Sequence, residues 1–137
     1  MNVMSLCTVL LVDDYEPFRR VLHSMLEEIP GLEIVGHAAD GLEAVQKAAE
    51  LQPDLILLDI GLPKLNGIQA AGHILKSFPY SKVVFLTQET SPEVVEEAFR
   101  LGAFGYVAKV HAGTHLLKVV EAVRQGKELV SARRAVG

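Results

Sequence analysis

Five side chains in this sequence have the types and positions that phosphoryl-group chemistry requires. Asp13, Asp14 and Asp59 supply carboxylates, Thr87 supplies a hydroxyl group and Lys109 supplies an amine. Three carboxylates that lie together repel one another unless a cation sits among them, and oxygen ligands of this kind suit Mg²⁺. A lysine amine binds phosphate as a point charge. If these groups meet, they favour phosphoryl transfer to a carboxylate, with Asp59 as the best candidate for the nucleophile.

Each of these acidic, hydroxyl and amine groups directly follows a short apolar run that is typical of a buried strand. In a parallel sheet, ligands bind outside the carboxyl ends of the strands, so we expect the groups to meet at one edge. The alternation of apolar runs and helical patterns predicts an α/β fold: a doubly wound five-stranded parallel sheet with helices on both faces. The expected strands are 8–12, 32–38, 55–58, 82–86 and 105–108, and the expected helices are 16–28, 41–51, 67–77, 92–101 and 112–125.

Local signals mark where several of these helices begin. Pro17 suits a first helical position. Asp40 and Glu43 have the spacing of a capping box, and Asn66 is the expected cap of the third helix. Asp13 and Asp14 have an alternative interpretation as acidic residues that stabilise the start of the first helix. Their match with Asp59 and Lys109 at equivalent strand ends favours a site instead.

Composition excludes several classes of protein. The chain of 137 residues is one domain in length, and 22% charged with 50% hydrophobic residues is too apolar for a disordered chain. Its one cysteine, Cys7, excludes a disulfide framework and points to a reducing compartment, so we expect a cytoplasmic protein. No apolar run is long enough to span a membrane. Residues 1–110 carry 8 Lys and Arg against 15 Asp and Glu, which argues against nucleic-acid binding by this domain.

Four segments carry a resemblance to a known family: VLLVDDYEPFRR, PDLILLDIGLPKLNG, VVFLT and GAFGYVAK. They resemble the receiver domain of bacterial two-component response regulators, which has the CheY-like fold with strand order 2-1-3-4-5. The resemblance covers residues 6–126. The phrases DIGLPKLNG, GAFGYVAK and EAVRQGKELVS are similar to receivers that are joined to LuxR-type (NarL/FixJ-like) helix-turn-helix domains.

The resemblance implies a role for each residue of the acidic group. Asp59 would be the phosphoacceptor, which receives its phosphoryl group from a histidine of a sensor kinase. Asp14 and Asp59 would bind Mg²⁺ directly, and Asp13 would bind it directly or through water. The backbone carbonyl of Gly61 would complete the cation site.

The same resemblance assigns the residues that respond to the phosphoryl group. Thr87 and Lys109 would contact it. Tyr106 would be a switch residue that turns inward as Thr87 moves toward the phosphate. Phosphorylation adds about −1.5 to −2 charge and three acceptor oxygens at one strand end, which would bias the surface of the fourth helix, fifth strand and fifth helix toward an active packing.

Three positions depart from the commoner family pattern. Val110 stands where the family often has a proline after a cis peptide bond, so the isomer here stays open. Gly61 and Glu89 occupy the two positions that tune hydrolysis of aspartyl phosphate in the family. Gly61 offers no side chain. We hypothesise that Glu89 changes the lifetime of the phosphoryl group, either by orienting water or by repelling the phosphate.

The sequence also bears on several alternative functions. A haloacid-dehalogenase-like phosphohydrolase also uses a strand-end aspartate, but it needs a second aspartate where this chain has Gly61. A nucleotide-binding module would need a glycine-rich phosphate loop, which the sequence lacks. A degenerate receiver would have lost Asp59, Lys109 or the acidic pair. A stand-alone receiver that acts by protein–protein contact remains an alternative to a transcription factor.

These considerations predict one receiver domain at residues 6–126, which is a phosphoacceptor with self-catalysed phosphoryl transfer and not a conventional enzyme. Residues 127–137 are expected to be a tail or the start of a linker to an output domain. The expected partners are a sensor histidine kinase and a second copy of the chain, through helices one and five or four and five. DNA binding would belong to a separate helix-turn-helix domain.

Overall fold

The computed structural model describes residues 6–88 and 91–125, which include eleven regular elements. None of the helices in these two ranges combines the length and the apolar character needed to cross a membrane. In chain order the elements are β1 (Cys7–Val12), α1 (Glu16–Glu27), β2 (Leu32–Ala38), α2 (Gly41–Leu51), β3 (Leu55–Asp59), α3 (Gly67–Ser77), β4 (Lys82–Thr87), α4 (Pro92–Arg100), β5 (Gly105–Ala108), the 3₁₀ helix η1 (Lys109–His111) and α5 (Ala112–Gln125).

The strands form one parallel sheet in the order β2-β1-β3-β4-β5, which confirms the predicted α/β class and strand order. β1 pairs with β2 on one side and with β3 on the other, where Val12 lies opposite Leu58. β4 pairs with β3 and β5, so that Thr87 lies opposite Ala108. All five strands therefore end at the same edge of the sheet.

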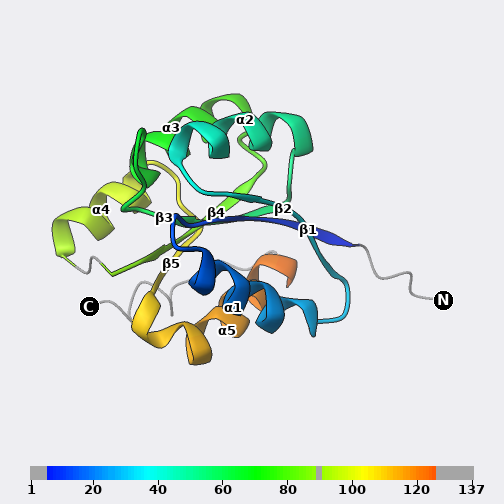
Figure 1. The fold of residues 1–137 in the computed structure, drawn as a ribbon. Coiled ribbons are helices and arrows are strands. Elements are labelled where there is room, and N and C mark those ends of the chain that lie inside the picture. The colour runs from blue at the N-terminus through cyan, green and yellow to red at the C-terminus, as the bar shows by residue number, and fades with distance from the viewer. Residues whose placement is uncertain (1–5, 89–90, 126–137) are drawn as a thin grey trace.

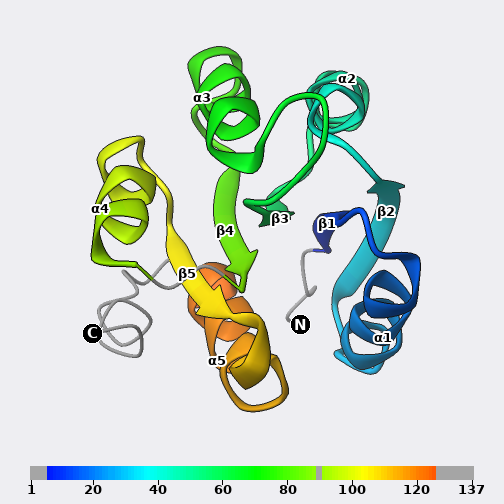
Figure 2. The same cartoon turned by 60° about the vertical axis from the view of Figure 1, so that its left-hand side comes forward.

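Helices cover both faces of the sheet. α2, α3 and α4 lie on one face, and α1 and α5 lie on the other (Figures 1 and 2). Successive residues of the buried strands point to opposite faces, so Leu58 packs beneath α2 and α3 while Leu57 packs against α1 and α5. β3 is buried along its whole length, as a central strand with helices on both sides must be.

The helix starts follow the expected side chains with one difference. Asn66 and Gln69 form a full capping box at the start of α3. Asp40 accepts a hydrogen bond from the Glu43 N–H at 2.8 Å and caps α2 as expected. The Glu43 side chain, however, accepts from the N–H of Ala39 at 2.7 Å and not from that of the cap residue. The Glu43 carboxylate thus ties the first turn of α2 to the residue that directly follows β2.

Two regions named in the sequence analysis lie outside the described residues: Glu89 and the predicted tail at 127–137. The remaining elements match their expected ranges to within one residue at most ends. β3 and β4 each extend one residue further than predicted, to Asp59 and Thr87, because these polar residues still pair with the neighbouring strand.

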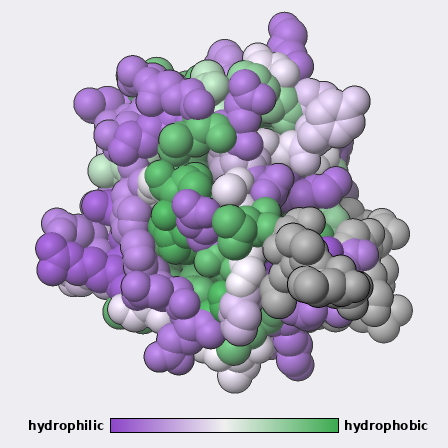
Figure 3. All heavy atoms as spheres, turned by 90° about the vertical axis from the view of Figure 1, so that its right-hand side faces the viewer, coloured by the Kyte–Doolittle hydropathy of each residue, from purple (hydrophilic) through white to green (hydrophobic). Residues whose placement is uncertain are grey.

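The two ends of the sheet differ in character. Figure 3 views the edge at which the strands begin, where apolar atoms are visible in the middle of the face and hydrophilic side chains surround them. At this edge Asp54, just before β3, accepts hydrogen bonds from the backbone and hydroxyl groups of Thr8 at 2.9 and 3.2 Å. The candidate site lies at the opposite edge.

Candidate functional site

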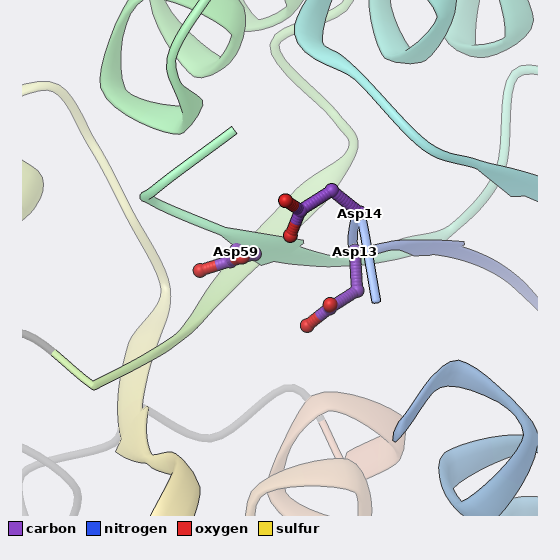
Figure 4. Close-up of side chains that lie close together, drawn as sticks. All are labelled: Asp13, Asp14 and Asp59. Atoms are coloured by element: carbon purple, nitrogen blue, oxygen red, sulfur yellow. The ribbon is translucent and has the colours of Figure 1, made fainter. Parts of the chain in front are cut away.

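Asp13, Asp14 and Asp59 meet at the carboxyl ends of β1 and β3 (Figure 4). Asp13 and Asp14 directly follow β1, and Asp59 is the last residue of β3, its neighbour in the sheet. One carboxylate oxygen from each of the three lies within 4.8 Å of the others. The sheet therefore brings together the three carboxylates that the sequence placed at strand ends.

Asp13 is fixed at the bottom of the site. Its side chain is 1% exposed, and its Oδ2 lies 2.7 Å from the Lys109 Nζ. Its Oδ1 accepts a hydrogen bond from the N–H of Tyr15 at 2.9 Å. Tyr15 is the cap residue of α1 and makes no side-chain capping bond, and Asp13 lies two residues before it. Asp13 thus binds the loop backbone and the Lys109 amine, and it does not occupy the capping position of the helix.

Lys109 links the two ends of the acidic group. It follows β5 directly, and its Nζ lies 3.3 Å from Asp59 Oδ2 as well as 2.7 Å from Asp13 Oδ2. Burial opposes the charged form, but hydrogen bonds and charge interactions with the two aspartates outweigh it and raise the pKa of Lys109. The peptide bond between Lys109 and Val110 is trans. The amine is therefore a fixed positive charge at the centre of the site.

Asp59 is a buried carboxylate that faces this charge. The residue is 5% exposed, and its Oδ1 accepts a hydrogen bond from the Gly61 N–H at 3.1 Å. Burial raises the pKa of Asp59, and the charge of Asp13 acts in the same direction, although Lys109 and the Gly61 N–H oppose the rise. Asp59 therefore carries its negative charge at a cost that an added cation would offset.

The donor set fits a hard divalent cation. It consists of carboxylate oxygens, and Asp14 is exposed while Asp13 and Asp59 are buried. Among the described residues of the site, the ammonium group of Lys109 is the one positive charge that contacts these three carboxylates. It can balance one of their negative charges, so two remain unbalanced. Mg²⁺ takes one or two protein carboxylates and keeps several waters, as this partly open arrangement allows.

Thr87 and Tyr106 occupy the β4–β5 side of the site. Thr87 ends β4 and is 2% exposed, and it lines the same cleft as Asp59 and Lys109. Tyr106 in β5 is fully buried and packs in the apolar cluster with Phe85 and Val95. Tyr106 is already buried in this structure, and its predicted role as a switch residue that follows Thr87 stays a prediction.

A cleft of about 1080 Å³ opens above these groups. Its polar floor contains Asp14, Asp59, Thr87 and Lys109, and its walls are largely apolar. The apolar residues that line it are Tyr15, Pro17, Phe18, Val21, Ile60, Val94 and Val110. Several of these residues are exposed, and a cluster of exposed large apolar side chains is unusual on a protein surface.

Sequence reasoning missed two kinds of contact around this site. The Lys109 Nζ lies 4.9 Å from the centre of the Phe18 ring, a cation–π arrangement. Arg19 donates to the backbone carbonyl oxygen of Asp13 at 2.6 Å, and also to a histidine, His37, at 3.0 Å. Arg19 and His23 lie four residues apart on α1, which places them on one helix face, and this spacing was the available signal.

Comparison with known proteins identifies the family of this chain. The family model described as "Response regulator receiver domain" matches residues 9–121. The chain therefore belongs to the response regulator receiver domain family of two-component signal transduction. The chain is a receiver domain, and its structural neighbours include response regulators of the LuxR family.

Individual relatives differ in what accompanies the receiver. "Response regulator GacA" of Pseudomonas viridiflava is 38% identical over 85% of this chain and 53% of that protein. A "Protein-glutamate methylesterase/protein-glutamine glutaminase" of Thermotoga maritima is 39% identical over 85% of this chain and 36% of that protein. The crystal structure of a LuxR-family two-component response regulator from Aurantimonas sp. SI85-9A1 has a TM-score of 0.85 and 31% identity, over 90% of this chain and 89% of that one. The chain spans about half the length, or less, of these curated relatives.

Proposed function

We propose that this domain accepts a phosphoryl group on Asp59 from a phosphohistidine of a sensor kinase. The observation that carries the proposal is the contact of one Asp59 oxygen with Lys109 while the same carboxylate faces the acidic pair and the open cleft. In the reaction an Asp59 oxygen forms a bond to phosphorus as the bond between phosphorus and the histidine nitrogen breaks. The imidazole leaves with a proton from solvent.

The residues of the site divide the work of this transfer. Lys109 neutralises charge on the phosphoryl oxygens, and the Thr87 hydroxyl donates to one of them. The Gly61 N–H holds Asp59 Oδ1, and Oδ2 lies beside the Lys109 amine, so Oδ2 would attack a phosphoryl group that this amine binds. Asp13, Asp14, Asp59 and the Gly61 carbonyl would hold Mg²⁺. When bound, the cation supplies charge neutralisation to the carboxylates and the transferred group.

The apolar walls of the cleft support a protein as the phosphoryl donor. Tyr15, just before α1, is 63% exposed, and Val110, just after β5, is 83% exposed, and both line the cleft. Large exposed apolar side chains around a polar floor are typical of a protein-binding surface. The helices of a kinase that present the phosphohistidine would cover these side chains. A cytoplasmic location belongs to this same proposal.

After phosphorylation, the added charge would draw Thr87 inward and keep Tyr106 in its buried position. Because α4, β5 and α5 adjoin these residues, their outer surface would change its packing and favour a homodimer. In a longer protein this surface would control a LuxR-type DNA-binding domain, as the names of several relatives suggest. Glu89 and Gly61 would set how long the phosphoryl group lasts.

The phosphoacceptor assignment is tested with two small donors, acetyl phosphate and phosphoramidate, the second of which has the P–N bond of phosphohistidine. With Mg²⁺ present, we expect intact-mass measurement to show one added phosphoryl group on the natural protein and none on Asp59→Asn. Asp54→Asn is the matched control, because Asp54 lies just before the other end of β3. This variant should gain one phosphoryl group on Asp59, as the natural protein does. An undiminished adduct in Asp59→Asn would contradict the proposal.

A further inference from the structure

Arg19 joins the loop after β1 to the strand at the edge of the sheet. Its Nη1 donates to the backbone carbonyl oxygen of Asp13 at 2.6 Å, and its Nε donates to His37 Nδ1 at 3.0 Å. Arg19 lies on α1, and His37 lies on β2. The carbonyl oxygen of Asp13 belongs to the peptide unit that joins Asp13 to Asp14. Arg19 therefore fixes the orientation of the peptide plane between two of the three clustered carboxylates.

His37 is itself held by a chain of contacts. Its Nε2 lies 2.9 Å from His23 Nδ1, and the two rings are 5.1 Å apart with 28° between their planes. Lys47 of α2 donates to the backbone carbonyl of His37 and lies 3.9 Å from Glu43. The charged or titratable groups that face His37 are thus Arg19 and His23 from α1 and Lys47 from α2. The residue opposite it on β1 is the apolar Leu11.

Hydrogen-bond chemistry fixes the protonation state that this chain of contacts requires. Arginine has only donors, so His37 Nδ1 must present a lone pair to Arg19. The proton of the neutral ring then sits on Nε2 and is donated to His23 Nδ1. Burial, and then the neighbouring charges of His23, Arg19 and Lys47, lower the pKa of His37 and keep the ring neutral at neutral pH. A second proton on His37 would remove the acceptor that Arg19 uses.

The close pair of ring nitrogens, His37 Nε2 and His23 Nδ1, does not favour a second metal site. A divalent cation between His23 and His37 would have two ligands from these rings, and Arg19 and Lys47 would repel it. Arg19 also already occupies His37 Nδ1. The arrangement fits a hydrogen-bonded support better than a metal centre.

We propose that Arg19, supported by neutral His37, is a positioning residue that orients Asp13 and Asp14 for a divalent cation. The inference rests on the cation site of the proposed function. It adds a dependence of cation binding on the protonation of His37, which the acidic residues alone do not provide. When His37 gains a proton, Arg19 loses one of its two anchors and the Asp13–Asp14 peptide plane is released. Cation affinity would then fall as acid protonates His37.

The first test uses the metal-free protein and therefore does not depend on the cation site. We expect the backbone amide resonances of Asp14 and Tyr15 to shift with pH at the same midpoint as the His37 ring. In His37→Asn this shift should be lost, because the asparagine oxygen stands near the Nδ1 position and accepts from Arg19 without titrating. His73→Asn, on an exposed face of α3, is the matched control and should titrate as the natural protein does. An unchanged titration of these amides in His37→Asn would overturn the proposal.

The second test measures Mg²⁺ binding by calorimetry. At neutral pH, Arg19→Gln should weaken Mg²⁺ binding by about tenfold, as loss of a group that orients a metal ligand typically does. Arg20→Gln is the matched control, because Arg20 is exposed and pairs only with Glu16 among the described residues. His37→Asn should match the natural protein at neutral pH and exceed it once acid protonates His37 in the natural protein.

The outcomes separate the two proposals. Equal Mg²⁺ affinity in Arg19→Gln and Arg20→Gln, with normal binding by the natural protein, would overturn the positioning role and leave the proposed function intact. Absence of Mg²⁺ binding by the natural protein would overturn the proposed cation site together with the role inferred for Arg19.

Discussion

Asp59 keeps a negative charge where burial disfavours one. An acid whose pKa is raised by folding binds its proton more tightly in the folded protein than in the unfolded chain. The contribution of such a group to stability therefore falls as pH rises from the ordinary aspartate pKa of 3.8 through the raised value, and stays low above it. Functional residues often lower stability in this way.

This argument predicts that Asp59→Asn stabilises the protein in the absence of divalent cations. At neutral pH the gain in the free energy of unfolding should be about 0.5–2 kcal/mol. Lys109 keeps its shorter ion pair with Asp13 in this variant. The gain should shrink as pH falls below the raised pKa, where the folded carboxyl takes up its proton, and should be small once pH lies below 3.8. Urea unfolding in a chelating buffer measures it, and a less stable Asp59→Asn at neutral pH would contradict the argument.

The single residues of the site were predictable to different degrees. Asp13, Asp14, Asp59, Thr87 and Lys109 were found because each follows an apolar run, and strand ends meet at one edge of a parallel sheet. Their roles with Mg²⁺ and phosphate stay predictions. The contacts of Arg19 and Phe18 depend on the side-chain conformations of α1, which no periodicity in the sequence determines.

At the scale of elements, the approach of α3 to the end of β3 determines where Asp59 sits. Gly67 is the first residue of α3, and its N–H donates to the Ile60 carbonyl at 2.8 Å. A Cβ atom at this position would lie 2.2 Å from the Asp59 carbonyl oxygen and 2.7 Å from the Ile60 Cα. Backbone atoms cannot give way as a flexible side chain can. The helix therefore reaches its place only without a side chain at Gly67.

Gly67→Ala should consequently destabilise the protein by about 1–3 kcal/mol and slow phosphoryl transfer, because it displaces Asp59. Gly72→Ala on the same helix is the matched control. A Cβ there meets nothing within 4 Å, so alanine should be neutral or stabilising by about 0.5–1 kcal/mol. Thermal unfolding and the acetyl phosphate assay report the two effects. Equal stability of the two variants would show that the close approach is not maintained in solution.

The elements themselves were largely predictable, and their errors have physical causes. Asp59 and Thr87 are polar and were placed after the strands, but backbone pairing continues through them because pairing does not depend on side-chain polarity. Asp40 and Glu43 have the spacing of a capping box. Glu43 instead accepts a hydrogen bond from the N–H of Ala39, the residue after β2, and the spacing alone does not distinguish this N–H from that of the cap residue.

At the scale of the whole molecule, one sheet separates two apolar clusters that share its strands. Leu57 and Leu58 are adjacent and fully buried, yet they belong to different clusters on opposite faces. Neither cluster can lose its packing without disturbing the strand that both use. We therefore expect the described part of the chain to unfold as one cooperative unit.

Leu57→Ala and Leu58→Ala test this expectation. Each removes a buried side chain and should lower the free energy of unfolding by about 2–5 kcal/mol. In both variants, circular dichroism and tyrosine fluorescence should report the same urea midpoint. Two separate transitions, or a change in one probe only, would show that the faces unfold independently.

The central place of β1 in the sheet also bears on how the protein is made. Among the strands of this sheet β1 is synthesised first, but one of its two edges stays unpaired until β3, beginning at Leu55, has been synthesised. An unpaired strand edge invites contacts with other chains, so the growing chain is most vulnerable to aggregation in this interval. When β3 docks, it completes the pairing of β1 and brings Asp59 beside Asp13. The nascent protein thus closes the middle of its core and assembles its acidic cluster in a single event.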